Sequence, residues 1–378
     1  MNRLALLPVA LLLPLPLLCG CAGNPSRMNS DYRIVGYVTG RTQVHRINPT
    51  KLTHVNYAFG HVKDGRIVLE GRDAPAHLAQ LQSLKARNPK LKVLLSVGGW
   101  GADGFSDAAL TDESRAAFAE SGVELVKRYA LDGIDLDWEY PGQPGPGIRF
   151  RAEDKHNFTL MLKALRERFD ALSDERGRRG ADRYLLTIAS ADREYFDHTE
   201  MDVLHVYLDY INVMCYDFYN SLTTVTGHHA GLYKSQGAAP DSRWTEASIK
   251  QHLAAGIPPK KLVVGVAFYG RSFIAGSTSQ PLNTPYEKYV DAPSFHDLRE
   301  RYIDRGGYER RWDDAAKAPY LWNPQTRALV TYDDEQSLRE KVKFIKRLNL
   351  GGAMYWEHAH DPDGVLLDVL YSGLRGGN

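Results

Sequence analysis

The sequence predicts a (β/α)8 barrel, an α/β fold in which eight parallel strands alternate with helices. Three observations support this prediction. Short apolar runs recur along the chain, and helix-period stretches separate most of them. One run carries a row of carboxylates at its C-terminal end, which is where such barrels hold their sites. The chain has 378 residues, 43% of them hydrophobic, which is enough for one large barrel core.

Eight apolar runs are short enough to be strands. They lie at 34–38, 55–59, 92–97, 133–137, 185–189, 210–215, 262–268 and 353–356. Apolar residues recur at helical spacing at 114–129, 158–172, 246–255 and 338–348. The helix after the first strand is weak, and we expect one turn at 46–51.

One connection is too long for a barrel loop. Between the seventh strand and its helix, Ser272 to about Gln325 hold more than fifty residues, with Tyr-rich, strand-like and helical pieces of their own. A structureless loop of that length is unusual in a compact domain. We therefore expect an α+β insertion subdomain at 272–325, between strand 7 and helix 7, and a barrel made of 32–271 and 326–378.

The N-terminal residues 1–20 indicate an export signal. Arg3 supplies a positive charge, and the apolar run 4–18 is too short and too interrupted by proline to be a transmembrane helix. The run ends in a stretch that resembles a bacterial lipobox, so we expect cleavage before Cys21 and a lipid on it. Residues 21–31 form a tether. The expected location is the bacterial cell envelope, at the outer membrane or cell surface, and simple secretion is the alternative.

The charge balance gives no reason to expect a charged partner. Lys and Arg number 47 against 46 Asp and Glu, for a net charge of +1. We therefore expect no nucleic-acid partner, and contact with a membrane only through the lipid anchor. We expect a monomer.

The segment 132–141 places three carboxylates on one face of a strand. Asp135, Asp137 and Glu139 alternate with apolar residues, so the opposite face is apolar. Repulsion and desolvation in such a row raise at least one pKa, and paired catalytic carboxylates share a proton in this way. The row therefore predicts an acid/base site. The alternative is a solvated strand edge, against which the apolar opposite face argues.

This motif resembles the signature of the family 18 glycoside hydrolases, the chitinases. Further stretches match family motifs in order: 96–100 at the third strand, 154–158 in the helix after the fourth, 214–217 at the sixth, 269–272 at the start of the insertion, and Trp356 at the eighth. The resemblance covers roughly residues 32–372. It implies the barrel with its insertion, and a chitinase that acts on chitin or chitooligosaccharides.

The resemblance also implies a substrate-assisted retaining mechanism, an exception among glycosidases. The acetamido oxygen of N-acetylglucosamine attacks the anomeric carbon and gives an oxazolinium intermediate. Glu139 is expected to protonate the leaving oxygen and then to activate water. Asp137 is expected to accept the acetamido N–H, and Asp135 to share a proton with Asp137. Tyr216 is expected to donate its hydroxyl to the acetamido oxygen.

Substrate-binding residues also follow from the resemblance. Trp356 is expected to form a hydrophobic floor beneath the reacting sugar, and Asp217 to bind the same sugar. The other expected cleft residues are Met214, Trp100, Tyr37, Phe59, Tyr140, Tyr269 and Arg271.

The sequence departs from the family pattern after the sixth strand. Many relatives place a tryptophan shortly after it, as a platform on the leaving-group side of the cleft. Here none follows until Trp244, and Phe218 or Tyr219 is the candidate substitute.

We expect no cofactor and no metal. His228 and His229 are adjacent in a polar loop, but no paired ligand spacing accompanies them. Three other functions stay open: an endo-β-N-acetylglucosaminidase acting on N-glycans, cleavage of peptidoglycan, and a sugar-binding lectin-like relative. The inserted subdomain counts against the N-glycan enzyme. The presence of Glu139 counts against the lectin, because lectin-like relatives have lost that acid.

Overall fold

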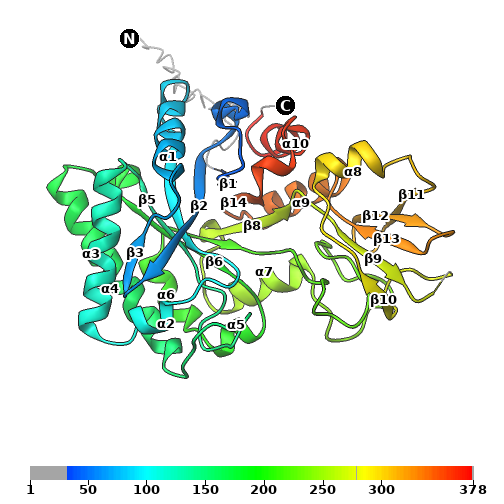
Figure 1. Cartoon of the computed structure of the whole chain (residues 1–378), viewed down its shortest axis with the longest axis horizontal. Coiled ribbons are helices and arrows are strands. Elements are labelled where there is room, and N and C mark those ends of the chain that lie inside the picture. The colour runs from blue at the N-terminus through cyan, green and yellow to red at the C-terminus, as the bar shows by residue number, and fades with distance from the viewer. Residues whose placement is uncertain (1–31, 278, 377–378) are drawn as a thin grey trace, which may run out of the picture.

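The computed structural model describes residues 32–277 and 279–376. Eight parallel strands close into a ring at the centre of the molecule (Figure 1), which confirms the predicted barrel. In ring order they are β1 (Arg33–Thr39), β2 (His54–Lys63), β4 (Lys92–Gly98), β5 (Gly133–Asp137), β6 (Leu185–Ser190), β7 (Tyr210–Val213), β8 (Leu262–Ala267) and β14 (Gly352–Trp356). Each corresponds to one of the eight predicted runs. A ninth strand, β3 (Arg66–Val68), forms a hairpin with β2 outside the ring.

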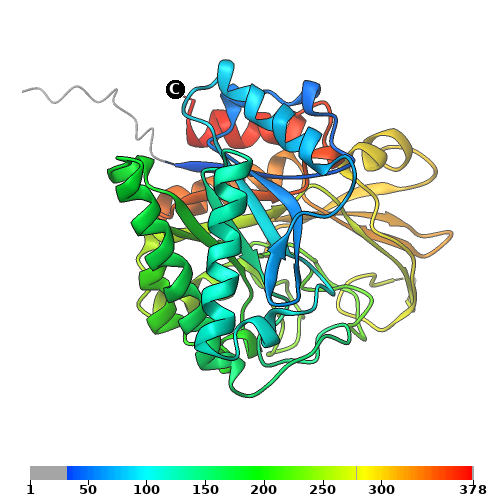
Figure 2. The same cartoon turned by 60° about the vertical axis from the view of Figure 1, so that its left-hand side comes forward.

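Helices surround the ring, as Figure 2 shows from a second side. The longer ones are α1 (Ala74–Ser83), α3 (Asp112–Arg128), α4 (Asp154–Glu175), α7 (Thr245–Ala254), α9 (Glu335–Arg347) and α10 (Val365–Leu374). Short helices α2 (Phe105–Ala108), α5 (Glu194–Asp197) and α6 (Met201–Leu204) lie in the connections. The side chains of Thr111 and Asp334 cap the first turns of α3 and α9 through reciprocal capping boxes. At 46–51 the structure has two 3-10 turns, Val44–Arg46 and Pro49–Lys51, instead of one helical turn.

A second, antiparallel sheet lies beside the barrel, at the right in Figure 1. Its strands are β9 (Arg271–Ala275), β10 (Tyr286–Tyr289), β11 (Glu309–Asp313), β12 (Ala318–Asn323) and β13 (Ala328–Thr331), in the order β10-β9-β13-β12-β11. Helix α8 (Phe295–Arg301) lies between β10 and β11 in the chain. The strands of this sheet lie between Arg271 and Thr331 in the chain. The predicted insertion, 272–325, falls within that range.

The second sheet and the barrel share buried apolar contacts. Leu298, Leu321 and Val330 belong to the same hydrophobic cluster as the barrel strands and their helices. A smaller cluster, which includes Phe273 and Trp322, lies within the second sheet itself. The sheet is therefore packed onto the barrel through a common core.

The predicted signal, the tether and Cys21 lie outside the described residues. Among the residues that are described, no helix is both long enough and apolar enough to cross a membrane.

Candidate active site at the barrel mouth

The carboxylate row lies at the C-terminal end of β5. Asp135 and Asp137 are on the strand, and Glu139 follows two residues after its end. The neighbouring β4 ends at Gly98, whose backbone has a φ of 120°, and a Cβ there would lie 2.0 Å from the carbonyl oxygen of Asp137. Only glycine fits so close to the row.

Asp135 is fully buried and is held by one donor from each of four strands. Tyr37 on β1 and Ser96 on β4 donate to its Oδ2, at 2.7 and 2.8 Å. Thr187 on β6 and Asn212 on β7 donate to its Oδ1, at 2.5 and 3.2 Å. Burial raises the pKa of Asp135, while these hydrogen bonds oppose the rise because they stabilise the charged form.

Asp137 and Glu139 have few hydrogen bonds by comparison. Burial raises the pKa of Asp137 well above its usual value, and the nearby charges of Glu139 and Asp135 add to the rise. Its Oδ1 is buried and has no hydrogen-bond partner among the described residues. Burial also raises the pKa of Glu139, to about 7, with a hydrogen bond from Tyr140 opposing the rise and the charge of Asp217 contributing to it. The four hydrogen bonds favour the charged form of Asp135, whereas burial and neighbouring carboxylates favour the protonated forms of Asp137 and Glu139.

An aromatic floor lies beside the row. The ring of Trp356, at the end of β14, stacks on Phe59 with centroids 5.5 Å apart and lies 5.7 Å from the ring of Tyr37. Tyr37 is only 2% exposed, and its hydroxyl is occupied by Asp135. Trp356 and Phe59 are half-buried and belong to the same small cluster as Met214. This arrangement leaves part of two aromatic rings available to a sugar face.

Tyr216 and Asp217 follow β7 at the same end of the barrel. Burial raises the pKa of Tyr216, so its hydroxyl remains a donor. Asp217 has a left-handed backbone with φ 57°, and Arg271 of β9 binds its carboxylate through Nε and Nη2, at 2.7 and 2.6 Å. Burial alone raises the pKa of Asp217, but His229 and Arg271 outweigh it and hold the pKa well below its usual value. Tyr269 is buried against Tyr216, with ring centroids 6.2 Å apart.

Trp100 and Tyr140 extend the site to one side. Trp100 is 56% exposed and packs edge-on against Tyr140, with centroids 6.1 Å apart. A groove of about 630 Å³ lies between the β2–β3 hairpin and the loop after β4, and it is lined by Trp100 and Phe59. A groove lined by an exposed tryptophan suits the apolar face of a sugar ring.

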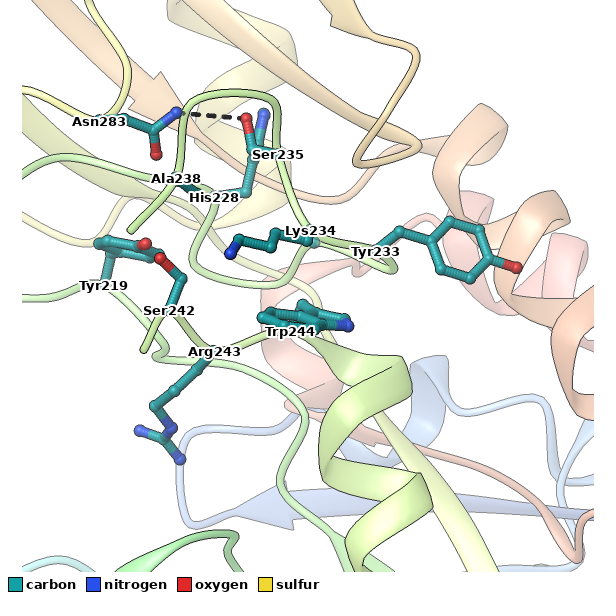
Figure 3. A pocket seen from close by; sticks show the side chains of 11 residues that line it. Tyr219, His228, Tyr233, Lys234, Ser235, Ala238, Ser242, Arg243, Trp244 and Asn283 are labelled. Carbon is teal, nitrogen blue, oxygen red and sulfur yellow. Dashed lines mark hydrogen bonds between the residues drawn. The ribbon is translucent and has the colours of Figure 1, made fainter. Parts of the chain in front are cut away.

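The expected substitutes for the missing tryptophan do not reach the surface. Phe218 and Tyr219 are 3% and 8% exposed, so neither offers a platform. Tyr219 and Trp244 instead line a cavity of about 10 Å³ away from the carboxylate row, where Lys234 lies over the Trp244 ring (Figure 3). A cavity of that size holds about one water molecule. The exposed apolar residue on this loop is Leu222, at 74%.

Sequence reasoning missed two residues that hold the row in place. Thr187 and Asn212 are polar residues in mostly apolar strands, and both donate to Asp135. Thr187 lies directly opposite Asp135 in the β5–β6 register. Their strand parity was the available signal, because a polar residue pointing into a barrel requires a buried partner.

Comparison with known proteins agrees with this geometry. The model of the glycosyl hydrolases family 18 matches residues 33–361. Chitinase A1 of Niallia circulans is 36% identical, over 92% of this chain and 59% of its own length. Chitotriosidase-1 of Mus musculus is 34% identical, over 86% of this chain and 73% of its own. A solved family 18 N-acetylglucosaminidase from Paenibacillus barengoltzii superposes with a TM-score of 0.85, is 42% identical, and covers 91% of this chain and 100% of its own. This chain thus spans about three fifths of the first relative's length.

Proposed function

The chain belongs to the glycosyl hydrolases family 18, and on this premise we propose that it is a chitinase, which hydrolyses β-1,4 linkages between N-acetylglucosamine units of chitin or chitooligosaccharides. The observation that carries the proposal is the buried carboxylate row, in which Glu139 has a pKa of about 7. Glycoside hydrolysis needs an acid that is protonated at working pH. The names of two relatives, a chitinase and a chitotriosidase, support this substrate class.

In the proposed mechanism, Glu139 protonates the glycosidic oxygen as the bond to the anomeric carbon breaks. The acetamido oxygen of the same sugar forms the new bond to that carbon, which gives an oxazolinium ion and retains the configuration overall. Water then attacks the anomeric carbon and gives its proton to Glu139. Asp137 accepts the acetamido N–H and stabilises the positive charge on the oxazolinium ion. Tyr216 donates to the acetamido oxygen. Groups aimed at developing charge are often the largest contribution to catalysis.

Three features of the site support these roles. The raised pKa of Asp137 lets it carry a proton shared with Asp135, which four donors stabilise as the anion. Trp356 and Phe59 form an apolar floor for the reacting ring. Asp217, held ionised by Arg271, can accept a sugar hydroxyl.

A second candidate is an N-acetylglucosaminidase that releases single sugars. The solved relative of that name, 42% identical over 91% of this chain, favours it. The chemistry at Glu139 is the same for both candidates, and they differ only in where the cleft is closed.

Product analysis tests both candidates. The protein is incubated with N-acetylglucosamine hexamer, an N-glycoprotein, peptidoglycan and fully deacetylated chitosan, and the products are identified by mass spectrometry. We expect cleavage of the hexamer to oligosaccharides and no cleavage of the other three. Monosaccharide as the sole early product favours the second candidate. Efficient cleavage of deacetylated chitosan contradicts substrate assistance.

We also propose that the protein is an exported lipoprotein anchored through Cys21. Bacterial lipoproteins carry several acyl chains, and more than one chain is needed for firm anchoring. Cell fractionation of Cys21→Ser is expected to move the activity from the membrane to the soluble fraction. A wild-type protein that is already soluble contradicts the proposal.

A further inference from the structure

His229 lies behind the candidate active site, and its ring faces the Asp217 carboxylate. Its side chain is fully buried, and neither ring nitrogen has a hydrogen-bond partner among the described residues. Its backbone is fixed, because its carbonyl accepts from Phe218 at 3.0 Å and its N–H donates to Thr331 at 3.4 Å. Its segment is a polar loop, as the sequence predicts, but the His229 side chain lies in the interior.

The carboxylate of Asp217 lies close to the ring. Nδ1 of His229 lies 3.6 Å from its Oδ1, slightly longer than an ordinary hydrogen bond. The ring packs against Tyr269, with centroids 5.2 Å apart. The other charged groups that act on it are Arg271 of β9 and Asp333, just after β13. Arg271, His229 and the Tyr269 hydroxyl therefore surround the Asp217 carboxylate.

Packing alone does not account for an imidazole at this position. Burying a polar ring without partners costs stability, and an apolar side chain of similar volume avoids that cost. Burial lowers the pKa of His229, so the ring is neutral at neutral pH and carries one N–H to offer. The adjacent His228 is a useful contrast, because it is 5% exposed and bonds through Nε2 to Asp313 at 3.1 Å.

We propose that His229 is a positioning residue for Asp217, and that with Arg271 it fixes the carboxylate that receives the sugar. This inference rests on the proposed function, in which Asp217 binds the reacting sugar. Arg271, on β9, donates to both oxygens of the Asp217 carboxylate. His229 lies against the side of the carboxylate that faces the interior. Without His229 the carboxylate keeps Arg271 and the Tyr269 hydroxyl but loses the group on its interior side, so sugar binding weakens while the proton transfer at Glu139 is preserved.

The test compares His229→Leu, His229→Gln and His228→Leu with the wild type. On N-acetylglucosamine hexamer we expect His229→Leu to raise KM at least about tenfold and to change kcat less than about threefold, which is the pattern of lost ground-state binding. Its Tm should stay close to that of the wild type, because leucine replaces a buried polar ring whose contact with Asp217 is longer than an ordinary hydrogen bond. His229→Gln keeps an N–H donor and should recover most of the affinity. His228→Leu should lower Tm, because Asp313 loses a partner, and leave KM unchanged.

Wild-type kinetic constants in His229→Leu overturn the inference, as does a raised KM accompanied by a lower Tm, which indicates a merely structural role. Binding is also measured by calorimetry in a Glu139→Gln background, so that turnover is not required. Absence of hexamer turnover and binding in the wild type counts against the proposed function instead. In that case crystal structures decide the inference: an Asp217 carboxylate in the same place in wild type and His229→Leu overturns it.

Discussion

At the scale of single residues, Glu139 is the carboxylate with a pKa suited to neutral-pH acid catalysis. We expect Glu139→Gln to lower kcat on chitooligosaccharides by at least about 10²–10⁴-fold, because the amide cannot transfer a proton. Hexamer affinity, measured by calorimetry, should stay within a few-fold of wild type, since the amide has the same shape. Glu153→Gln, at an exposed position, is the matched control. Substantial turnover of unactivated substrate by Glu139→Gln excludes this role.

The charge of Asp217 should raise the pH above which activity falls, which we call the alkaline edge of the pH profile. Glu139 must be protonated to act, so kcat/KM should fall as pH rises through about 7. Asp217 raises the pKa of Glu139, so Asp217→Asn should lower that pKa and move the alkaline edge to lower pH, by roughly 0.5–1 unit. The position of the edge in the pH profile is the measurement, whatever the loss in absolute rate. Asp368→Asn, on α10, is the control, and an edge that stays in place in both variants contradicts the argument.

The sequence identified the residues whose pattern is local and missed those whose partners are distant. Asp135, Asp137 and Glu139 alternate within five residues, so strand parity alone brings them together. Thr187 and Asn212 reach Asp135 only because the ring closes, over sequence separations of 52 and 77 residues. The burial of Phe218 and Tyr219 is likewise set by the packing around their loop, which local composition does not reveal.

At the scale of helices and strands, all eight barrel strands could be predicted because each is a short apolar run. The structure differs where propensity is weak. Proline at position 49 starts a 3-10 turn and prevents a continuous helix at 46–51. The β2–β3 hairpin was not predicted, because β3 has only three residues and lies outside the ring. The strand pairing of the second sheet could not be predicted. Pairing depends on register, and a Tyr-rich composition does not specify register.

Helix α9 is joined to the end of β13 by a buried ion pair. Lys341 and Asp333 are both fully buried, and Asp333 also accepts from Ser337 at 2.8 Å. We expect Lys341→Met to lower the free energy of unfolding by about 3–5 kcal/mol, because it leaves a buried carboxylate without its cation. Urea denaturation measures the change. Lys343→Met, whose side chain is 71% exposed in its pair with Glu340, should stay within about 1 kcal/mol. If Lys341→Met also loses no more than about 1 kcal/mol, the Asp333 carboxylate does not depend on Lys341 for its stability in the folded protein.

At the scale of the whole molecule, the candidate site depends on both sheets. The carboxylate row and the aromatic floor come from the barrel, whereas Arg271, which holds Asp217, comes from the first strand of the second sheet. Tyr286 of β10 also donates to the carbonyl of Thr223 at 2.6 Å, on the loop that follows Asp217. The second sheet therefore supports the loop that carries a binding residue, in addition to standing beside the cleft.

The shared core leads to a prediction about unfolding. Leu298, Leu321 and Val330 are buried in the same cluster as the barrel, so separating the second sheet would expose apolar surface on both parts. We expect one cooperative thermal transition, with equal calorimetric and van't Hoff enthalpies. Leu298→Ala, which removes a fully buried side chain, should cost about 2–5 kcal/mol and shift that single transition to lower temperature without splitting it. Scanning calorimetry measures the transitions of the wild type and of Leu298→Ala. Two transitions in the wild type, or a low-temperature shoulder that appears only in Leu298→Ala, indicate instead that residues 272–325 unfold as a separate unit.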